Sequence, residues 1–428
     1  MNRKIKKICA QQVFTPRHVM GVEAIVETEG GIVERAICNS GVSIGTHEVK
    51  FSYDGGNKWG GKGVSSAVDA VNTLINDSLC GMDVTQQYEL DHAMLDIGGG
   101  RGKQLCGGNA IAAVSAALLK AGAKASEMPL YRYIGGERAC RLPVPAAAAF
   151  IGSDRWGGGV TTPGGKPSVS FQSFGFNSFS EASYAAWEVY SLWQEEMKKR
   201  DIPEGITFMY YIQKGKFKNS DEEIFALMAD CITRAGHDGK IGIQADFAAD
   251  TYYDKENKVY RGLLSGEPKD RDQLLDTYLH LVKTYPFVSI EDPFHEDDYE
   301  SHALLTKNVD IQVVGDDLFT TNRDRLKNGT ALGACNTMLL KVNQIGTISD
   351  AFEAVQFAYD CGYGVMPCES RGEGETIADY CVGLGAGSVR EQAILSPASN
   401  RFLEIEKELG SRAEFWGPRG LRGKRFQG

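Results

Sequence analysis

The sequence predicts an α/β protein in which an N-terminal α+β domain precedes an eightfold β/α barrel. Three short apolar, β-branched runs carry this prediction, and each contains or ends in a charged residue: 285–294, 311–318 and 338–344. Such runs, bounded by turn residues, are typical of strands that are buried on both faces. Glu291, Asp316 and Lys341 lie 25 positions apart from one to the next. This spacing fits the repeated strand and helix unit of a barrel.

A fourth run, residues 240–247, places Asp246 near its end. Because the carboxyl ends of parallel barrel strands meet on one side of the barrel, we expect Asp246, Glu291, Asp316 and Lys341 to converge. Two carboxylates about 4 Å apart repel by roughly 4 kcal/mol at an effective dielectric near 20. Bound protons or a metal ion must therefore offset the repulsion among the three carboxylates. Oxygen ligands without Cys or His favour Mg²⁺ over Zn²⁺. A structural network of ion pairs is the alternative interpretation.

The bulk composition is typical of a globular protein of two domains. The chain has 428 residues and a formal net charge of -10, which argues against general nucleic-acid binding and against an anionic membrane surface. No apolar run approaches the roughly 20 residues of a membrane helix, and the basic start lacks the apolar core of a secretory signal. The ten cysteines show no Cys-x-x-Cys spacing, so we expect a cytoplasmic protein.

The first domain is expected to span residues 1–138. Alternating apolar and polar residues predict an antiparallel meander over residues 5–53. Within it, the glycine-punctuated residues 40–48 indicate either a loop that contacts a ligand or a plain surface loop. Helices are predicted over residues 65–79 and 109–124, the second with Asn109 as its N-cap.

The second domain is expected to span residues 139–428. Residues 152–167 form a long loop, which is usually functional or disordered in a compact domain. Residues 180–200 predict an amphipathic helix whose aromatic side chains, Trp187, Tyr190 and Trp193, belong to the core. The basic, glycine-rich tail, residues 417–428, is expected to be frayed.

Several ordered stretches of this chain resemble the enolase family, the phosphopyruvate hydratases of glycolysis. The stretches are Ser-Gly-Val-Ser-Ile-Gly (40–45), Gly-Asn-Ala-Ile (108–111), Leu-Pro-Val-Pro (142–145), Ser-Ile-Glu-Asp-Pro-Phe (289–294), Val-Gly-Asp-Asp-Leu (314–318), Leu-Leu-Lys-Val-Asn-Gln-Ile-Gly (339–346) and Glu-Leu-Gly-Ser (408–411). The resemblance covers nearly the whole chain, and it is far more specific than any single short motif.

The resemblance implies an N-terminal α+β domain followed by an enolase-type barrel. It implies that Asp246, Glu291 and Asp316 hold a tightly bound Mg²⁺. By the same match, Lys341 is the base that removes the proton beside the substrate carboxylate, and Ser40 belongs to a loop that closes over a second Mg²⁺. Lysine bases combined with one or two Mg²⁺ ions are the general pattern of such sites. A homodimer, or a larger assembly of dimers, is the usual state of the family.

The chain departs from the family where hydroxide is expelled and where the rest of the substrate binds. Tyr211 stands where the family has the glutamate that assists hydroxide departure, and Gln172 and Ser173 stand where it has a Gln-Glu pair. Asp154 replaces the histidine of the family's Gly-Ser-His loop, and Glu369 replaces the histidine of its phosphate region. Arg371 matches the family's arginine with a shift of one position, and Arg390 replaces a lysine. The half of the site that abstracts the proton is therefore kept, and the other half is changed.

These departures leave several roles open. Tyr211, Glu369 and Asp154 are candidate acids, although a phenol with a pKa near 10 is a weak one and Tyr211 could simply fill space. Arg371 and Arg390 could bind a phosphate or phosphonate in bidentate fashion. Together with Ser40, Asp154 and Gln172, the two arginines are the predicted substrate-binding residues.

The sequence thus predicts a Mg²⁺-dependent, phosphopyruvate hydratase-like lyase that acts on 2-phosphoglycerate or a related small phospho- or phosphono-acid. We expect weak or absent turnover of 2-phosphoglycerate, because the glutamate that assists hydroxide departure is missing. The alternatives are an enzyme similar to the carboxyphosphonoenolpyruvate synthases, or a non-catalytic scaffold that keeps only metal or ligand binding.

Overall fold

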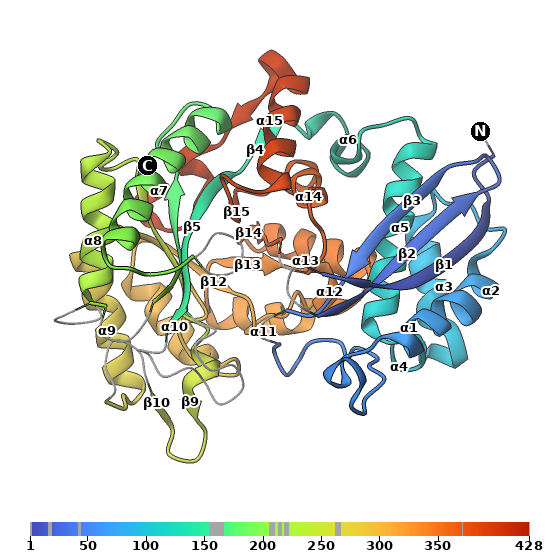
Figure 1. Ribbon diagram of the computed structural model, residues 1–428, viewed down its shortest axis with the longest axis horizontal. Helices are drawn as coiled ribbons and strands as arrows, with labels where there is room; N and C mark the ends of the chain where they lie inside the picture. The colour runs from blue at the N-terminus through green and yellow to red at the C-terminus, as the bar shows by residue number, and fades with distance from the viewer. Residues whose placement is uncertain are drawn as a thin grey trace.

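The computed structural model places a smaller N-terminal part beside a larger barrel (Figure 1). The residues that it describes are 2–15, 19–41, 44–153, 167–204, 210–212, 216–217, 222–261, 267–369 and 371–427, with only the backbone described at 152, 153, 211 and 212. Within these residues, no helix combines the length and the apolar character that a membrane crossing requires. The predicted combination of an α+β domain and an α/β barrel is confirmed.

The N-terminal part is built on a three-stranded antiparallel sheet. Its strands, β1 (Ile5–Phe14), β2 (Met20–Thr28) and β3 (Val33–Cys38), follow one another in the sheet as they do in the sequence. Helix α5 (Gly108–Ala125) packs on β2 and β3 and buries most of its small side chains there. The small residues of α5 allow this close approach, and the apolar faces of the strands and the helix form one core.

The meander is shorter than the predicted range of 5–53, because β3 ends at Cys38. The chain then leaves the sheet and crosses to the barrel, where Val49 N–H donates to Gln344 O at 2.8 Å. The described residues beyond Cys38 therefore include a segment that contacts the barrel rather than a further strand.

The predicted helices of this part are present, with two local differences. The range 65–79 contains α1 (Ser65–Ala70), a wider turn (Val71–Ile75) and α2 (Asn76–Leu79). Asn109 does not cap α5, because its side chain instead exchanges two hydrogen bonds with the backbone of Ser52, at 3.0 and 3.1 Å. The remaining helices here are α3 (Gln87–Gly100), α4 (Gly102–Cys106) and α6 (Leu130–Gly135).

Among the described residues, eight strands form the barrel. In chain order they are β5 (Val144–Ser153), β6 (Ser168–Ser173), β8 (Ile241–Asp246), β11 (Phe287–Glu291), β12 (Gln312–Gly315), β13 (Thr337–Leu340), β14 (Gly364–Pro367) and β15 (Ser388–Gln392). Their order in the sheet is β14-β13-β12-β11-β8-β6-β5-β15, and a parallel bridge between Cys368 and Arg390 joins its two ends. Only β6 runs against its two neighbours, β5 and β8. A short strand, β7 (Tyr210–Ile212), pairs with β5.

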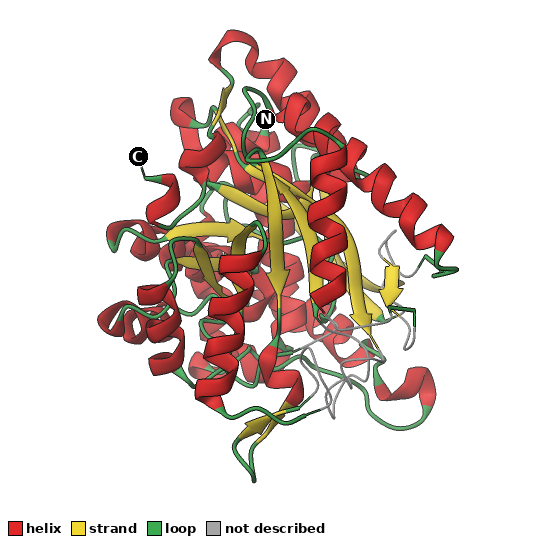
Figure 2. Ribbon diagram, turned by 90° about the vertical axis from the view of Figure 1, so that its left-hand side faces the viewer, coloured by secondary structure: helices red, strands yellow, loops and turns green. Residues whose placement is uncertain are grey.

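Helices surround these strands, as Figure 2 shows. They are α7 (Phe179–Lys199), α8 (Glu222–Arg234), α9 (Arg271–Thr284), α10 (Tyr299–Asn308), α11 (Arg323–Leu332), α12 (Val342–Ile345), α13 (Ile348–Asp360), α14 (Thr376–Leu384) and α15 (Pro397–Leu409). Polar side chains begin many of them. Ser178 caps α7, Asp270 forms a capping box with Gln273 on α9, and Asn322 and Thr347 cap α11 and α13. These caps satisfy backbone N–H groups that a helix start leaves without partners.

The described part of the chain also contains two short strand pairs. β9 (Tyr253–Asp254) and β10 (Val259–Tyr260) form a hairpin, and β4 (Arg141–Leu142) pairs with β16 (Glu414–Phe415).

The aromatic residues of α7 and the C-terminal tail differ in part from expectation. Tyr190 and Trp193 are core residues, as predicted, but Trp187 is half exposed and stacks on Tyr184. The tail is not frayed up to residue 427. Phe426 is buried, and Arg425 Nη1 donates to Phe287 O at 2.8 Å, which ties the tail to the start of a barrel strand.

Candidate active site

Charged side chains that are far apart in the sequence meet at the C-terminal ends of the barrel strands. Glu291 ends β11 and lies opposite Asp246, the last residue of β8. Asp316 and Lys341 directly follow β12 and β13. Arg390, in β15, lies at the same end, beside the residue that follows β14. The regular strand and helix units between these residues place them on one rim, which is the side of such barrels that carries chemistry.

The amine of Lys341 binds Asp316 inside this group. Lys341 Nζ donates to Asp316 Oδ2, and Gln344 Nε2 donates to Asp316 Oδ1 at 2.7 Å. Burial alone would lower the pKa of Lys341, but the attraction of the Asp316 carboxylate outweighs it and the pKa lies above its ordinary value. Burial likewise works to raise the pKa of Asp316, yet Lys341 holds it below its usual range. The pair is therefore ionised, with the proton on the amine.

A second buried cation, Arg390, binds the other two acids. Its Nη2 donates to Asp246 Oδ2 at 2.7 Å and to Ser168 Oγ, and its Nη1 donates to Glu291 Oε1 at 3.1 Å. Burial raises the pKa of Glu291 to about 8, although the charge of Arg390 acts in the opposite direction. The other oxygen, Glu291 Oε2, is buried and makes no hydrogen bond to any described residue. This oxygen is open to a further cation.

The acids at this rim fit a hard divalent cation. Glu291, Asp292 and Asp316 each present a carboxylate oxygen within 4.8 Å of the others. Asp292 uses both oxygens to accept the backbone N–H groups of Asp316 and Asp317, at 2.9 and 2.8 Å, so it serves mainly to shape the turn after β12. Glu291 and Asp316, with Asp246 across the strand pair, remain as the metal-binding candidates. Carboxylate oxygens are the ligands that Mg²⁺ prefers.

Arg371 is bound from the N-terminal domain. Its Nη2 donates to Glu48 Oε1 at 2.6 Å and its Nη1 donates to Glu48 Oε2, with both side chains about 1% exposed. Asn39 N–H donates to Arg371 O at 2.9 Å, which places the neighbouring, buried Ser40 beside the same arginine. The guanidinium that the sequence predicts for an anionic substrate group is thus occupied by a carboxylate of the chain itself.

Gln172 does not lie with the other predicted site residues. Because β6 runs against β8, Ser168 pairs with Asp246 at the rim while Gln172 pairs with Gly242 near the other end. Four residue steps along the strand lead from Ser168 to Gln172, a distance of about 13 Å. The substrate contact predicted for Gln172 is therefore wrong, and Ser168 takes the position at the rim.

The candidate acids are only partly placed. Asp154 lies outside the described residues, and Tyr211 belongs to β7 but its side chain is not among those described. Glu369 follows Cys368 at the end of β14, and its Oε1 accepts from Gly374 N–H at 3.4 Å. Its role as an acid stays a prediction.

Sequence reasoning missed Ser168, Gln344 and Glu48. A count of residues along a reversed β6 would have found Ser168. Gln344 belongs to the stretch 339–346, three residues after Lys341. The short helix α12 directs the side chain of Gln344 toward the rim, where it donates to Asp316. Glu48 stands in the quoted loop, but nothing near it in the sequence indicates Arg371 as its partner.

Comparison with known proteins agrees with this architecture. The family described as "Enolase, N-terminal domain" matches residues 5–134, and the family described as "Enolase, C-terminal TIM barrel domain" matches residues 141–423. The enolase of Methanopyrus kandleri is 39% identical over 97% of this chain and 98% of its own length. The enolase of Methanocaldococcus jannaschii is 38% identical over 95% and 96%, and that of Bifidobacterium animalis subsp. lactis is 38% identical over 96% and 97%. The chain belongs to the enolase family.

Proposed function

We propose that the protein is a Mg²⁺-dependent carbon–oxygen lyase of the phosphopyruvate hydratase type. Its substrate would be a small phospho- or phosphono-acid from which it removes the proton beside the carboxylate. One observation carries the proposal: the Lys341 amine binds Asp316 at the rim where Arg390 binds Asp246 and Glu291, and Glu291 Oε2 has no hydrogen-bond partner among the described residues. An amine beside a cation site is what this proton abstraction requires.

The residues would divide the work as follows. Mg²⁺ held by Asp246, Glu291 and Asp316 would stabilise the charge that develops on the substrate carboxylate, and would offset the Asp316 charge that now holds the Lys341 proton. Lys341 would accept the proton at Nζ once its own pKa has fallen. Gln344, which donates to Asp316 Oδ1 at 2.7 Å, would keep that carboxylate in one orientation.

The leaving-group half of the site carries the residues that differ from the family. Departure of hydroxide needs an acid, typically worth about 10²- to 10⁴-fold in rate. Tyr211, Glu369 and Asp154 remain the candidates, and Arg371 would have to exchange Glu48 for a phosphate before it could bind the substrate. We therefore propose weak or absent turnover of 2-phosphoglycerate. An enzyme similar to the carboxyphosphonoenolpyruvate synthases is the second candidate, because the residues that differ from the family lie in the leaving-group and phosphate-binding half of the site.

A direct assay tests both statements. Purified protein with Mg²⁺ is incubated with 2-phosphoglycerate and with a panel of three-carbon phospho- and phosphono-acids, and products are followed by phosphorus NMR. We expect conversion of one panel member and little phosphoenolpyruvate. Rapid, complete conversion of 2-phosphoglycerate would contradict the altered leaving-group half. A protein that binds Mg²⁺ but converts nothing would indicate the non-catalytic scaffold.

Assembly and location follow as further proposals. A homodimer, or an assembly of dimers, would follow from the family pattern, and sedimentation velocity would test it. A cytoplasmic location is supported by the cysteines: all ten lie among the described residues and none of them forms a disulfide.

A further inference from the structure

Residues 45–48 of the N-terminal domain, here called the docking segment, lie on the barrel. Glu48 reaches Arg371 in the site described above, whereas Thr46 and His47 make contacts outside that site. The segment contacts the loop after β11 through Glu296, which is buried at 2% exposure. Thr46 N–H donates to Glu296 Oε2 at 2.9 Å, and Thr46 Oγ1 donates to Glu296 Oε1. A single buried carboxylate therefore binds both the backbone and the side chain of Thr46. This arrangement fixes the segment more firmly than either bond alone.

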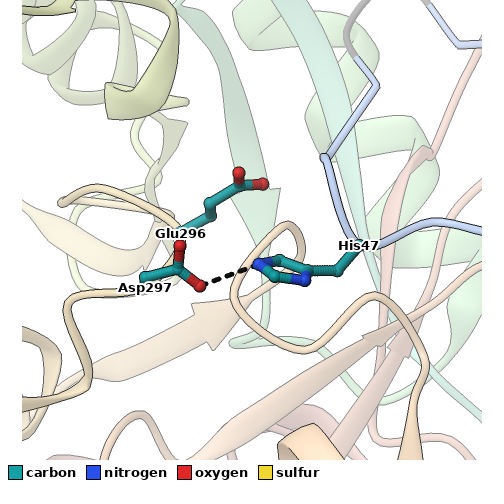
Figure 3. A group of neighbouring side chains, drawn as sticks. All are labelled: His47, Glu296 and Asp297. Carbon is teal, nitrogen blue, oxygen red and sulfur yellow. Dashed lines mark hydrogen bonds and ion pairs between the residues drawn. The ribbon is translucent and has the colours of Figure 1, made fainter. Parts of the chain in front are cut away.

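The next residue makes a second contact with the same loop. His47 Nε2 lies 2.8 Å from Asp297 Oδ1, and Figure 3 shows the imidazole pointing at this carboxylate with Glu296 beside it. Arg325 supports the loop from the barrel side, since its Nη2 donates to Glu296 O at 2.6 Å and both Nη atoms lie 3.3 Å from Asp297 Oδ1.

His47, Glu296 and Asp297 also resemble a metal-binding group, because their ligand atoms lie within 4.8 Å of one another. Thr46 already occupies both oxygens of Glu296, and a guanidinium stands beside Asp297. These partners make the group a contact between protein elements rather than a cation site.

The other residues of the docking segment connect this contact to the site. Glu48 binds Arg371 through both carboxylate oxygens. A Cβ on Gly45 would lie 3.0 Å from Asp317 Oδ1, so the backbone passes directly over the turn that follows β12. The segment thus spans from the loop after β11, across the turn after β12, to the residues after β14.

We propose that Glu296 and Asp297 are positioning residues: they hold the docking segment on the barrel, and thereby hold Glu48 against Arg371 at the rim of the reaction site. The proposal rests on the proposed function only for its effect on the reaction. Neither residue touches the Lys341 amine or the acids around it in any contact that the described residues make, so their effect on chemistry is transmitted by the segment.

Hydrogen exchange tests the contact without substrate. Peptides covering residues 44–50 of the full-length protein are compared between wild type and Glu296→Ala. We expect about tenfold faster exchange, which corresponds to the loss of one hydrogen bond to a charged acceptor. Glu296→Gln should exchange nearly as slowly as wild type, because its amide can accept from Thr46 N–H and donate to Thr46 Oγ1. Glu300→Gln, on the exposed face of α10, is the matched control and should change nothing.

Unchanged exchange in Glu296→Ala would overturn the proposal. If that variant fails to fold, His47→Gln and Asp297→Asn carry the test, since they alter exposed side chains, and each should accelerate exchange in the same peptides. No acceleration in either would overturn the proposal as well.

Kinetics separate positioning from a merely structural role. With the substrate that the panel identifies, and at a temperature at which both proteins are folded, Glu296→Ala should lower kcat/KM about tenfold, and Glu296→Gln should restore it. Faster exchange with unchanged kcat and KM would contradict the positioning role. If wild type converts no substrate, the proposed function fails, and hydrogen exchange alone then decides whether Glu296 and Asp297 hold the segment.

Discussion

The pair formed by Glu48 and Arg371 should dominate the stability of the contact between the two domains. Glu48 comes from the N-terminal domain and Arg371 follows a barrel strand, and both side chains are about 1% exposed. Glu48→Gln keeps the size of the side chain but removes the charge. In wild type, burial acts to lower the pKa of the Arg371 guanidinium, but Glu48 holds this pKa above its ordinary value. In Glu48→Gln the buried guanidinium would keep its charge but lose its principal counterion.

The expected cost follows from this geometry. Removing one partner of a buried ion pair costs about 3 to 5 kcal/mol. Asp316 and Asp317 also attract Arg371, which favours the lower end of that range. An unfolding entropy of about 2.1 cal/mol/K per residue amounts to about 0.9 kcal/mol/K over the 428 residues, so Glu48→Gln should lower Tm by about 3 to 6 °C.

Differential scanning calorimetry of a double-mutant cycle provides the measurement. Glu48→Gln and Arg371→Met are compared with the double variant, which should be more stable than Glu48→Gln alone because it no longer carries the buried charge. Glu353→Gln, which removes the exposed ion pair with Arg323, is the matched control and should lower Tm by less than about 1 °C. A Glu48→Gln protein as stable as the control would refute the reasoning.

Three further results are expected. Glu291→Gln should weaken Mg²⁺ binding, measured by calorimetric titration, by about 100-fold or more, because it replaces a proposed ligand oxygen and its charge; unchanged affinity would exclude Glu291 as a ligand. Burial lowers the pKa of His302 to about 4, so the folded protein binds fewer protons than the unfolded chain between about pH 4 and 6.5, and stability should be lost as pH falls through this window by up to about 3 kcal/mol. Histidine NMR should therefore show a resonance, absent in His302→Gln, that stays neutral below pH 5, whereas a midpoint above pH 6 would contradict this. Ser168→Ala should weaken Mg²⁺ binding severalfold, since Ser168 helps to hold Arg390, and identical affinity would show that this hydrogen bond has no influence.

The convergence of acids and lysine was predictable because it follows from chain geometry. Glu291, Asp316 and Lys341 each come at the end of an apolar run, and equal spacing along the sequence becomes a common rim when strands are parallel and adjacent. Arg390 could be placed at this rim by the family match. The hydrogen bonds of Arg390 to Asp246 and Glu291 could not be predicted, because they depend on which side chains a closed barrel brings together.

The errors have equally physical causes. Gln172 was assigned to the site from residue similarity, but β6 is antiparallel, and reversing a strand moves the residue at the rim from its end to its start. The partnership of Glu48 and Arg371 joins residues 323 positions apart in two domains, and no local pattern encodes it. The end of the meander at Cys38 was missed because the pattern of apolar and polar residues does not indicate that the chain leaves the sheet there and crosses to the barrel.

Solvent-deuterium exchange is the most direct test of the account. The protein is incubated in D₂O with Mg²⁺ and three-carbon phospho- or phosphono-acids, and deuterium at the carbon beside the carboxylate is followed by NMR. Wild type should incorporate deuterium, Lys341→Ala should lose at least about 100-fold in rate, and Lys103→Ala, which removes an amine paired with Asp350 instead, should behave as wild type. Persistent exchange in Lys341→Ala would contradict the account, as would the absence of exchange in wild type with every acid.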